Sequence, residues 1–235
     1  MSPLPGAVRT LGLVLLVTAL VQPACRAAPD ARPRAASPGA PTPELREGPL
    51  IVFLGDSLTA GWNLDEDQAF PALIEKQLRS EGHRVRVLNA GVSGDTSAGG
   101  LRRLPWVLRQ RPEVVVIALG ANDALRGQDL RATESNLRGM LELVGRSGAR
   151  AILVGMKVPP NYGVDYARRF ERIYPRLAGE LGVPLVPFLL AGVAGRPELN
   201  FADGLHPTAH GHRILAATVL PFLRPLIPAR PAPGR

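Results

Sequence analysis

The sequence predicts a three-layer α/β/α sandwich built on a five-stranded parallel sheet. Short apolar segments alternate with longer amphipathic ones, and the apolar segments recur roughly every 30 residues, as in repeated βαβ units. Four of the five apolar segments are rich in Val, Ile or Leu with little alternation, which is typical of strands covered on both faces. Because βαβ crossovers are right-handed, the connecting helices should cover both faces of the sheet.

The expected elements follow one another along a single domain at residues 50–228. Strands are predicted at 50–54, 84–89, 114–119, 151–154 and 184–186. Helices are predicted at 69–81, 98–110, 130–146, 166–181 and 208–223. A disordered tail is predicted at 229–235. Ligands of such sheets bind beyond the carboxyl ends of the strands, so the polar residues that follow the strands are the candidates for a functional site.

Residues 1–25 have the pattern of an export signal. Arg9 supplies a short positive region, and the apolar run at 11–21 is shorter than the roughly 17–25 residues that span a bilayer. Cys25 lies where a bacterial lipoprotein signal has its lipidated cysteine, although Gln22 replaces the usual leucine. The sequence leaves open whether the exported protein is periplasmic or is a lipoprotein anchored to a membrane through Cys25. Residues 26–49 are rich in Pro and Ala and are predicted to form an extended linker.

The composition excludes several other classes of protein. With 46% hydrophobic residues in 235, the chain can bury a full core. The formal net charge of +8 comes from arginines scattered along the expected helices, such as Arg102, Arg103, Arg109 and Arg111, without interleaved aromatic residues. We therefore predict a solvated basic surface and no nucleic-acid partner. A single cysteine permits no disulfide within the chain.

The first expected strand leads through Gly55 and Asp56 to Ser57, so a serine lies where a strand passes into a helix. A glycine permits the tight turn, and a helix N-terminus lends positive potential to a serine alkoxide. Thr59 occupies the place of the second glycine in a G-x-S-x-G elbow, and no Gly-Lys-Ser/Thr follows as in a P-loop. On this motif alone, Ser57 is interpreted equally well as a nucleophile and as a helix N-cap.

Two further strand ends carry groups that can donate hydrogen bonds to a ligand. Gly94 follows the second expected strand, and its N–H can approach a ligand closely because no side chain intervenes. Asn122 follows the third strand, and its side-chain amide can donate to an oxyanion. Each residue also has a structural interpretation. Gly94 would then be a turn glycine before a helix capped by one of residues 95–97, and Asn122 would be a cap or an Asx turn.

Asp203 and His206 lie on the expected loop before the last helix, where Gly204 lets them fold back on each other. The carboxylate would accept a hydrogen bond from His206 Nδ1, which leaves Nε2 to take a serine proton. The structural alternative is a surface loop with local caps. A zinc site at His206, His210 and His212 is a further alternative. Against it, His212 leaves the helical face that the other two histidines share, and no Cys or acidic residue completes the ligand set at a typical spacing.

Together, a Ser, a Gly, an Asn and an Asp-x-x-His supply a nucleophile, two oxyanion donors and an oriented base. This ordered set resembles the SGNH (GDSL-type) hydrolases, in particular their branch of periplasmic acyl-CoA thioesterases, lysophospholipases and arylesterases. The segments that carry the resemblance are residues 55–58 (GDSL), 93–97 (SGDTS), 101–105 (LRRLP), 120–123 (GAND), 160–163 (PNYG) and 203–207 (DGLHP). Ala121 departs from the branch, which often has a second glycine there.

The resemblance implies a role for each matching residue. Ser57 would be the nucleophile, His206 the general base and then the general acid, and Asp203 the residue that orients His206. The N–H groups of Ser57 and Gly94 and the side-chain amide of Asn122 would form the oxyanion hole.

The resemblance also implies a flavodoxin-like sheet, no metal or organic cofactor, and hydrolysis of small acyl esters or thioesters, with lysophospholipids among the candidate substrates. Two alternatives stay open. One is a carbohydrate O-deacetylase of the same fold, and the other is a non-catalytic module that binds acyl groups or glycans.

Overall fold

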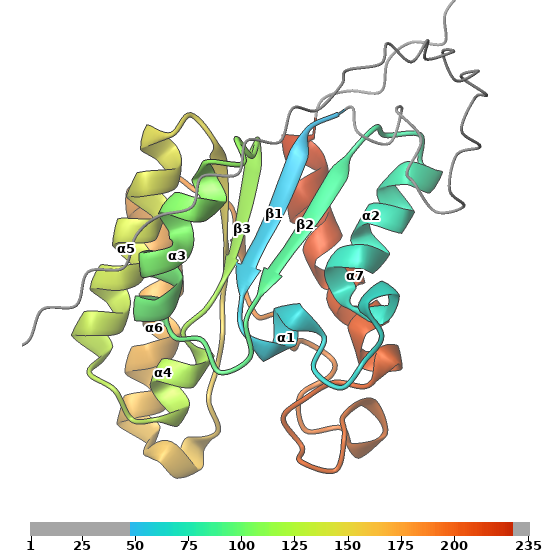
Figure 1. The fold of residues 1–235 in the computed structure, drawn as a ribbon. Coiled ribbons are helices and arrows are strands. Elements are labelled where there is room, and N and C mark those ends of the chain that lie inside the picture. Colours follow the sequence, from blue (N-terminus) through green and yellow to red (C-terminus); the bar gives the residue numbers. More distant parts are fainter. Residues whose placement is uncertain (1–47, 228–235) are drawn as a thin grey trace, which may run out of the picture. The chain divides into compact units, whose positions relative to one another are not determined.

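A computed structural model describes residues 48–227, and its central element is a parallel sheet of five strands (Figure 1). The strands are β1 (Leu50–Gly55), β2 (Arg86–Gly91), β3 (Val114–Ala118), β4 (Arg150–Val154) and β5 (Leu185–Val186). They lie in the order β2-β1-β3-β4-β5, and every neighbouring pair is parallel. This is the flavodoxin-like order of doubly wound sheets. The predicted fold class is confirmed.

Helices cover both faces of the sheet (Figure 1). The α-helices are α1 (Ser57–Ala60), α2 (Phe70–Ser80), α3 (Ser97–Leu108), α4 (Ala121–Leu125), α5 (Leu130–Arg146), α6 (Val164–Leu181) and α7 (Ala209–Leu223). Helices α2 and α7 pack together on one face, whereas α3, α5 and α6 line the other. Short 3-10 turns occur at Glu66–Gln68, Pro160–Tyr162, Pro197–Leu199 and Arg224–Leu226.

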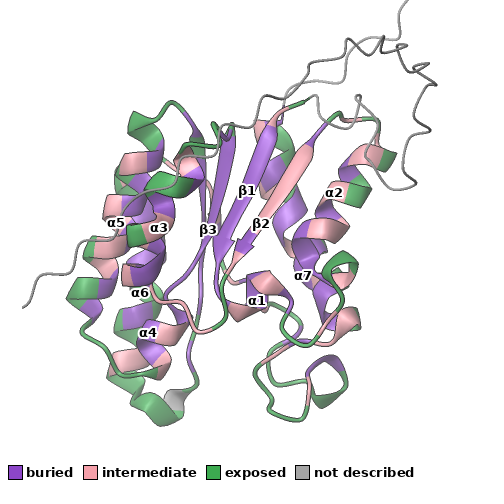
Figure 2. Ribbon diagram, in the orientation of Figure 1, coloured by how far each residue is buried: buried purple, intermediate pink, exposed green. Residues whose placement is uncertain are grey.

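Burial explains why the strand segments read as continuous apolar runs. Every residue of β1 and β3 is buried, because helices cover both of their faces (Figure 2). The edge strand β2 is mostly half-buried. The rings of Phe53 in β1 and Phe70 in α2 meet edge to face with centroids 5.4 Å apart, which ties helix α2 to the sheet. Full burial of one such side chain typically stabilises a fold by about 1.5–3 kcal/mol.

The boundaries of β2 differ from the sequence prediction. The strand was expected at 84–89 and instead runs over Arg86–Gly91. Pairing with β1 decides this, because Arg86 lies opposite Leu50 and Gly91 lies opposite Gly55. Register with a neighbouring strand is a tertiary property, and local propensity does not report it.

Several predicted segments lie outside the described residues. These are the export signal at 1–25 with Cys25, most of the linker at 26–49, and the tail at 229–235. The last linker residue already joins the sheet, because the Pro49 carbonyl accepts a hydrogen bond of 3.0 Å from the Arg86 N–H. Within residues 48–227, no helix combines the length and the apolar character needed to cross a membrane.

Candidate active site

The turn at residues 55–57, named the nucleophile turn after the role predicted for Ser57, connects β1 to α1 at the carboxyl edge of the sheet. Asp56 is the N-cap of α1, and its carboxylate accepts a 3.0 Å hydrogen bond from the Leu58 N–H. Ser57 is the first helical residue, so the interpretation of Ser57 as the cap is wrong and its hydroxyl is available for other contacts. Helix α1 rests directly on β2, because a Cβ on Gly91 would lie only 2.2 Å from the Ala60 nitrogen.

A chain of hydrogen bonds links Ser57 to His206 and Asp203. The Ser57 Oγ lies 2.9 Å from His206 Nε2, although the two residues are 149 positions apart. The other ring nitrogen, Nδ1, lies 2.7 Å from Asp203 Oδ2. Because the ionised Asp203 can only accept, Nδ1 carries a proton and Nε2 is left to accept from the serine hydroxyl. The structure thus brings together the three residues predicted as a triad.

Asp203 is held as a carboxylate by its own loop. Its Oδ1 accepts backbone N–H bonds from Leu205 at 2.9 Å and from His206 at 3.0 Å. The bond from the His206 N–H, followed by the bond from the His206 ring, lowers the pKa of Asp203 from its ordinary 3.8 to about 2. A negative charge therefore faces Nδ1 throughout the neutral pH range, as the orienting residue of a triad requires.

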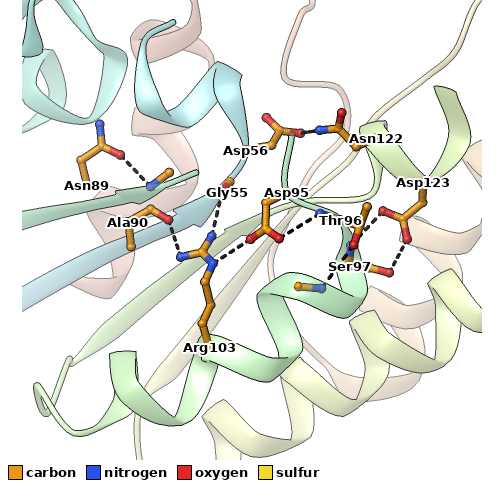
Figure 3. A network of polar contacts seen from close by, with 12 residues as sticks. Gly55, Asp56, Asn89, Ala90, Asp95, Thr96, Ser97, Arg103, Asn122 and Asp123 are labelled. Atoms are coloured by element: carbon orange, nitrogen blue, oxygen red, sulfur yellow. Dashed lines mark hydrogen bonds and ion pairs between the residues drawn. The ribbon is translucent and has the colours of Figure 1, made fainter. Parts of the chain in front are cut away.

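Asn122 lies in α4, beside the nucleophile turn. Its Nδ2 donates a long hydrogen bond of 3.4 Å to Asp56 Oδ2 (Figure 3). Burial raises the pKa of the Asp56 carboxyl from 3.8 to about 6, an effect that the Leu58 N–H bond and the nearby His206 partly offset. Asn122 and Ser57 also line the same cavity, which is described below.

Gly94 occupies a different environment from the other predicted site residues. It follows β2 in a left-handed conformation with φ 77°, and its carbonyl accepts a 2.9 Å hydrogen bond from Arg126 Nη2. Gly94 is not among the residues that line the cavity around Ser57. The assignment of its N–H to an oxyanion hole stays a prediction.

Arg103 of α3 joins the ends of two strands, a role that the sequence did not indicate. Its guanidinium donates to the Gly55 carbonyl at 2.8 Å, to the Ala90 carbonyl at 2.6 Å and to Asp95 Oδ2 at 2.7 Å (Figure 3). The expectation of a solvated surface position is wrong for Arg103, which is half-buried beneath the nucleophile turn. The available signal was its helical spacing from Gly99 and Val107, both of which are buried.

Asp123 anchors α3 rather than facing the cavity. Its buried carboxylate accepts hydrogen bonds from the Ser97 N–H at 2.8 Å and from the Ser97 hydroxyl (Figure 3). It also accepts one from the Thr133 hydroxyl at 3.3 Å. From helix α4 it therefore satisfies an N–H of the first turn of α3, which is a structural role.

A cavity of about 490 Å³ opens beside Ser57, Asn122 and His206. Most of its walls are apolar, and the apolar side chains are Leu58, Ala121, Leu125, Met156, Val158, Pro159, Phe188, Leu190, Ala194 and Leu205. Five of the lining residues lie in the loops at 159–163 and 189–200, namely Pro159, Leu190, Ala194, Gly195 and Asn200. Leu189 and Val193 instead pack in the core with 1% and 0% exposure. An apolar cavity that ends at a serine and an amide suits an acyl chain with its carbonyl at the polar end.

His212 serves the fold rather than a metal ion. It is buried in α7, its Nδ1 accepts a 3.1 Å hydrogen bond from the Phe70 N–H at the start of α2, and burial lowers its pKa from 6.5 to about 4. His206 uses both ring nitrogens in the contacts with Asp203 and Ser57. Across residues 48–227, no three His, Cys, Asp or Glu side chains gather in an arrangement that could hold a metal ion.

Asp56 and His212 make stability depend on pH in opposite directions. The raised pKa of Asp56 gives stability that is present below pH 3.8 and is lost as the pH rises through about 6. The lowered pKa of His212 gives stability that is present above pH 6.5 and is lost as the pH falls towards 4. Each effect amounts to about 2 kcal/mol between about pH 4.5 and about pH 6.5. We expect the free energy of unfolding of the wild type to change little across this interval.

Urea unfolding of single variants at a series of pH values should measure the contributions of Asp56 and His212 separately. Asp56→Asn keeps an acceptor for the Leu58 N–H but does not titrate, so its free energy of unfolding should rise by about 2 kcal/mol from about pH 4.5 to about pH 6.5. His212→Gln should show a fall of similar size. Parallel curves for the wild type and both variants would contradict these assignments.

Comparisons of the sequence and of the fold with known proteins both point to one family of hydrolases. The model of the GDSL-like Lipase/Acylhydrolase family matches residues 53–214. The chain is 43% identical over 178 residues to Esterase TesA of Pseudomonas aeruginosa. This alignment covers 75% of this chain and 89% of that protein. It is 40% identical over 178 residues to Thioesterase 1/protease 1/lysophospholipase L1 of Escherichia coli (strain K12). That alignment covers 75% of this chain and 84% of the other protein.

The solved crystal structure of TesA matches the fold of this chain with a TM-score of 0.74 and 43% sequence identity. The match covers 76% of this chain and 99% of that chain. The likeness therefore extends over nearly the whole of the solved structure, sheet and covering helices included.

Proposed function

Since the chain belongs to the GDSL-like lipase/acylhydrolase family and is a serine hydrolase of carboxylic esters, we propose that Ser57, His206 and Asp203 form its catalytic triad. The observation that carries this proposal is the hydrogen-bonded chain from Asp203 through His206 to Ser57, which ends beside an apolar cavity. Its components have the order and the geometry that acyl transfer to a serine requires.

In the proposed reaction, the Ser57 Oγ attacks the acyl carbonyl carbon while His206 Nε2 takes the hydroxyl proton. Asp203 keeps the Nδ1–H of His206 in place and stabilises the imidazolium. The proton then passes to the oxygen or sulfur of the leaving group, which departs as an alcohol or a thiol. Water, deprotonated by the same Nε2, hydrolyses the acyl-enzyme and restores Ser57.

Three donors are proposed to stabilise the oxyanion of the tetrahedral intermediate. Ser57 begins α1, where the first N–H groups of a helix have no partner within the helix. Asn122 lines the cavity beside Ser57 and offers its side-chain amide. The N–H of Gly94, which follows β2, is proposed as the third donor. Fixed donors aimed at the developing charge are typically the largest electrostatic contribution to this kind of catalysis.

The cavity supports a substrate with an apolar acyl group. Its walls come from α1, α4, the segments that follow β4 and β5, and the loop before α7, and they carry few polar groups apart from the proposed catalytic ones and Lys157. The Lys157 ammonium is held by Glu171 at 2.6 Å and lies 5.5 Å from the centroid of the Phe188 ring. Esters and thioesters of aliphatic acids fit these walls, and lysophospholipids carry such chains.

The proposed site of action is outside the cytoplasm. The support is the export-signal pattern of residues 1–25, with Cys25 as the candidate for lipid attachment. Mass spectrometry of the mature N-terminus would distinguish a lipidated Cys25 from cleavage at a nearby residue such as Ala27.

A series of p-nitrophenyl esters from acetate to dodecanoate tests the acyl cavity. We expect kcat/KM to rise about fourfold for each added CH2 group that the cavity buries, because each contributes about 0.8 kcal/mol, and then to level off once the cavity is full. An acyl-thioester series assayed in parallel should follow the same order.

Other outcomes would favour the alternatives. Release of acetate from an acetylated polysaccharide, without activity on longer acyl chains, would overturn the acyl-cavity proposal in favour of a carbohydrate O-deacetylase. Absence of hydrolysis across all three substrate sets would favour a binding module.

A further inference from the structure

Trp62 is fixed to the nucleophile turn through its main chain. Helix α1 ends at Ala60, and its C-cap Gly61 has a left-handed φ of 76° that turns the chain back. The Trp62 N–H then donates a 3.1 Å hydrogen bond to the Ser57 carbonyl, as the Gly61 N–H also does. The position of the indole is thereby coupled to the backbone of Ser57.

The Trp62 side chain lies against the base. Its ring centroid is 4.4 Å from that of His206, with an angle of 31° between the ring planes. On another side, the indole meets Phe201 edge to face at 6.0 Å, and Phe201 N–H bonds to the His206 carbonyl at 2.8 Å. The loop that carries His206 therefore holds the indole as well.

Trp62 contacts the base without forming part of the acyl site. His206 and Leu205 line the cavity, but Trp62 does not. Trp62 is 42% exposed, so burial of its apolar surface is a weak reason for this placement. A role in the reaction would act through His206 rather than through the substrate.

On this geometry, and resting on the triad proposed above, we propose that Trp62 is a positioning residue. Its indole holds the His206 ring between Asp203 and Ser57 and stabilises the imidazolium that forms when Nε2 takes the serine proton. Trp62 gives and takes no proton. The charge arises on the ring that its π-face contacts, and such cation–π contacts attract a cation at short range.

The expected size of the effect follows from typical cation–π strengths. They correspond to a change of about 2- to 30-fold in rate, the upper end applying where water is excluded.

The charged and titratable groups around His206 are Asp203 on its own loop, Asp56 at the start of α1, and His212 on α7. Because all three remain in a Trp62 variant, a changed pH profile reports the loss of the indole.

The test compares Trp62→Leu, Trp62→Phe and the wild type as full-length chains on p-nitrophenyl butyrate between about pH 5 and about pH 9. Leu keeps an apolar side chain without a π-face, so we expect kcat to fall by about 2- to 30-fold with little change in KM. The acid limb of the kcat/KM profile should move to lower pH, because the protonated base loses stabilisation. Trp62→Phe should retain most of the wild-type rate and profile.

Trp106→Ala is the matched control, since Trp106 is 50% exposed on α3 and is the second of the two tryptophans. It should leave the rate and the profile unchanged. Wild-type kcat in Trp62→Leu would overturn the proposal, and so would a lower kcat with an unmoved acid limb, which would indicate a merely structural role.

A fluorescence titration separates this proposal from the proposed function. In a Trp106→Phe background, Trp62 is the sole tryptophan, and a protonated imidazole in contact with an indole quenches its emission. The emission should fall as His206 gains a proton, and the addition of His206→Gln should abolish this titration. A titration unchanged by His206→Gln would overturn the contact, whatever the activity of the enzyme.

Discussion

Ser57→Ala is expected to lower kcat for p-nitrophenyl butyrate by about six orders of magnitude, the loss typical of removing a serine nucleophile from a triad. The acyl-enzyme cannot form, and the remaining oxyanion donors and binding groups accelerate only direct attack by water. The fold should be unaffected, because the Asp56 carboxylate, rather than the Ser57 hydroxyl, caps α1. Steady-state rates and thermal unfolding of the purified variant measure both effects.

Ser80→Ala is a suitable control for this loss. The Ser80 hydroxyl also lies on a helix, where it donates to the Gln77 carbonyl at 2.7 Å in an exposed position. This variant should keep the wild-type rate. A Ser57→Ala protein with a rate within about a hundredfold of the wild type would exclude Ser57 as the nucleophile, since such a residue contributes far more.

Asn122→Ala is expected to lower kcat by about 10²- to 10³-fold with a much smaller change in KM. The loss of one oxyanion donor typically costs about 2.7–4 kcal/mol of transition-state stabilisation, while the ground-state carbonyl makes weaker use of the same donor. Rates across a range of p-nitrophenyl butyrate concentrations separate kcat from KM.

The contact between Asn122 and Asp56 requires a control, because an effect of Asn122→Ala could act through the buried Asp56 carboxyl. Asp56→Asn changes that carboxyl to an amide and keeps the acceptor that caps α1. If Asn122 stabilises the oxyanion directly, Asp56→Asn should retain most of the activity. An equal loss of kcat in both variants would place the effect at Asp56.

Local sequence patterns were enough to predict the fold. Helix α5 forms over 130–146 as expected, since its apolar residues recur on one face and Asp129 caps its N-terminus by accepting the Arg131 N–H. The buried runs of β1 and β3 were recognisable because strands covered on both faces need apolar side chains throughout. The edge strand β2 carries a weaker pattern, and its boundaries were displaced.

The sequence also singled out residues that the structure brings together at the candidate site. Strand ends and the helix-preceding loop are recognisable locally, so Ser57, Asn122, Asp203 and His206 could be singled out as a set. The interaction between Asp203 and His206 is itself local, because the two residues lie three positions apart around a glycine. These features depend on chain neighbours, which a sequence contains directly.

Only the tertiary structure decided which distant groups meet. In the folded chain, His206 contacts Ser57, and the Arg103 guanidinium donates hydrogen bonds to the carbonyls of Gly55 and Ala90 at the ends of two strands. His212 accepts a hydrogen bond from the first N–H of α2 instead of binding a metal ion. The Trp62 ring also lies against the His206 ring. Each of these contacts joins segments that approach only when the sheet orders its strands and the helices pack on it. Local propensity carries no information about such approaches, because they depend on which buried surfaces fit together.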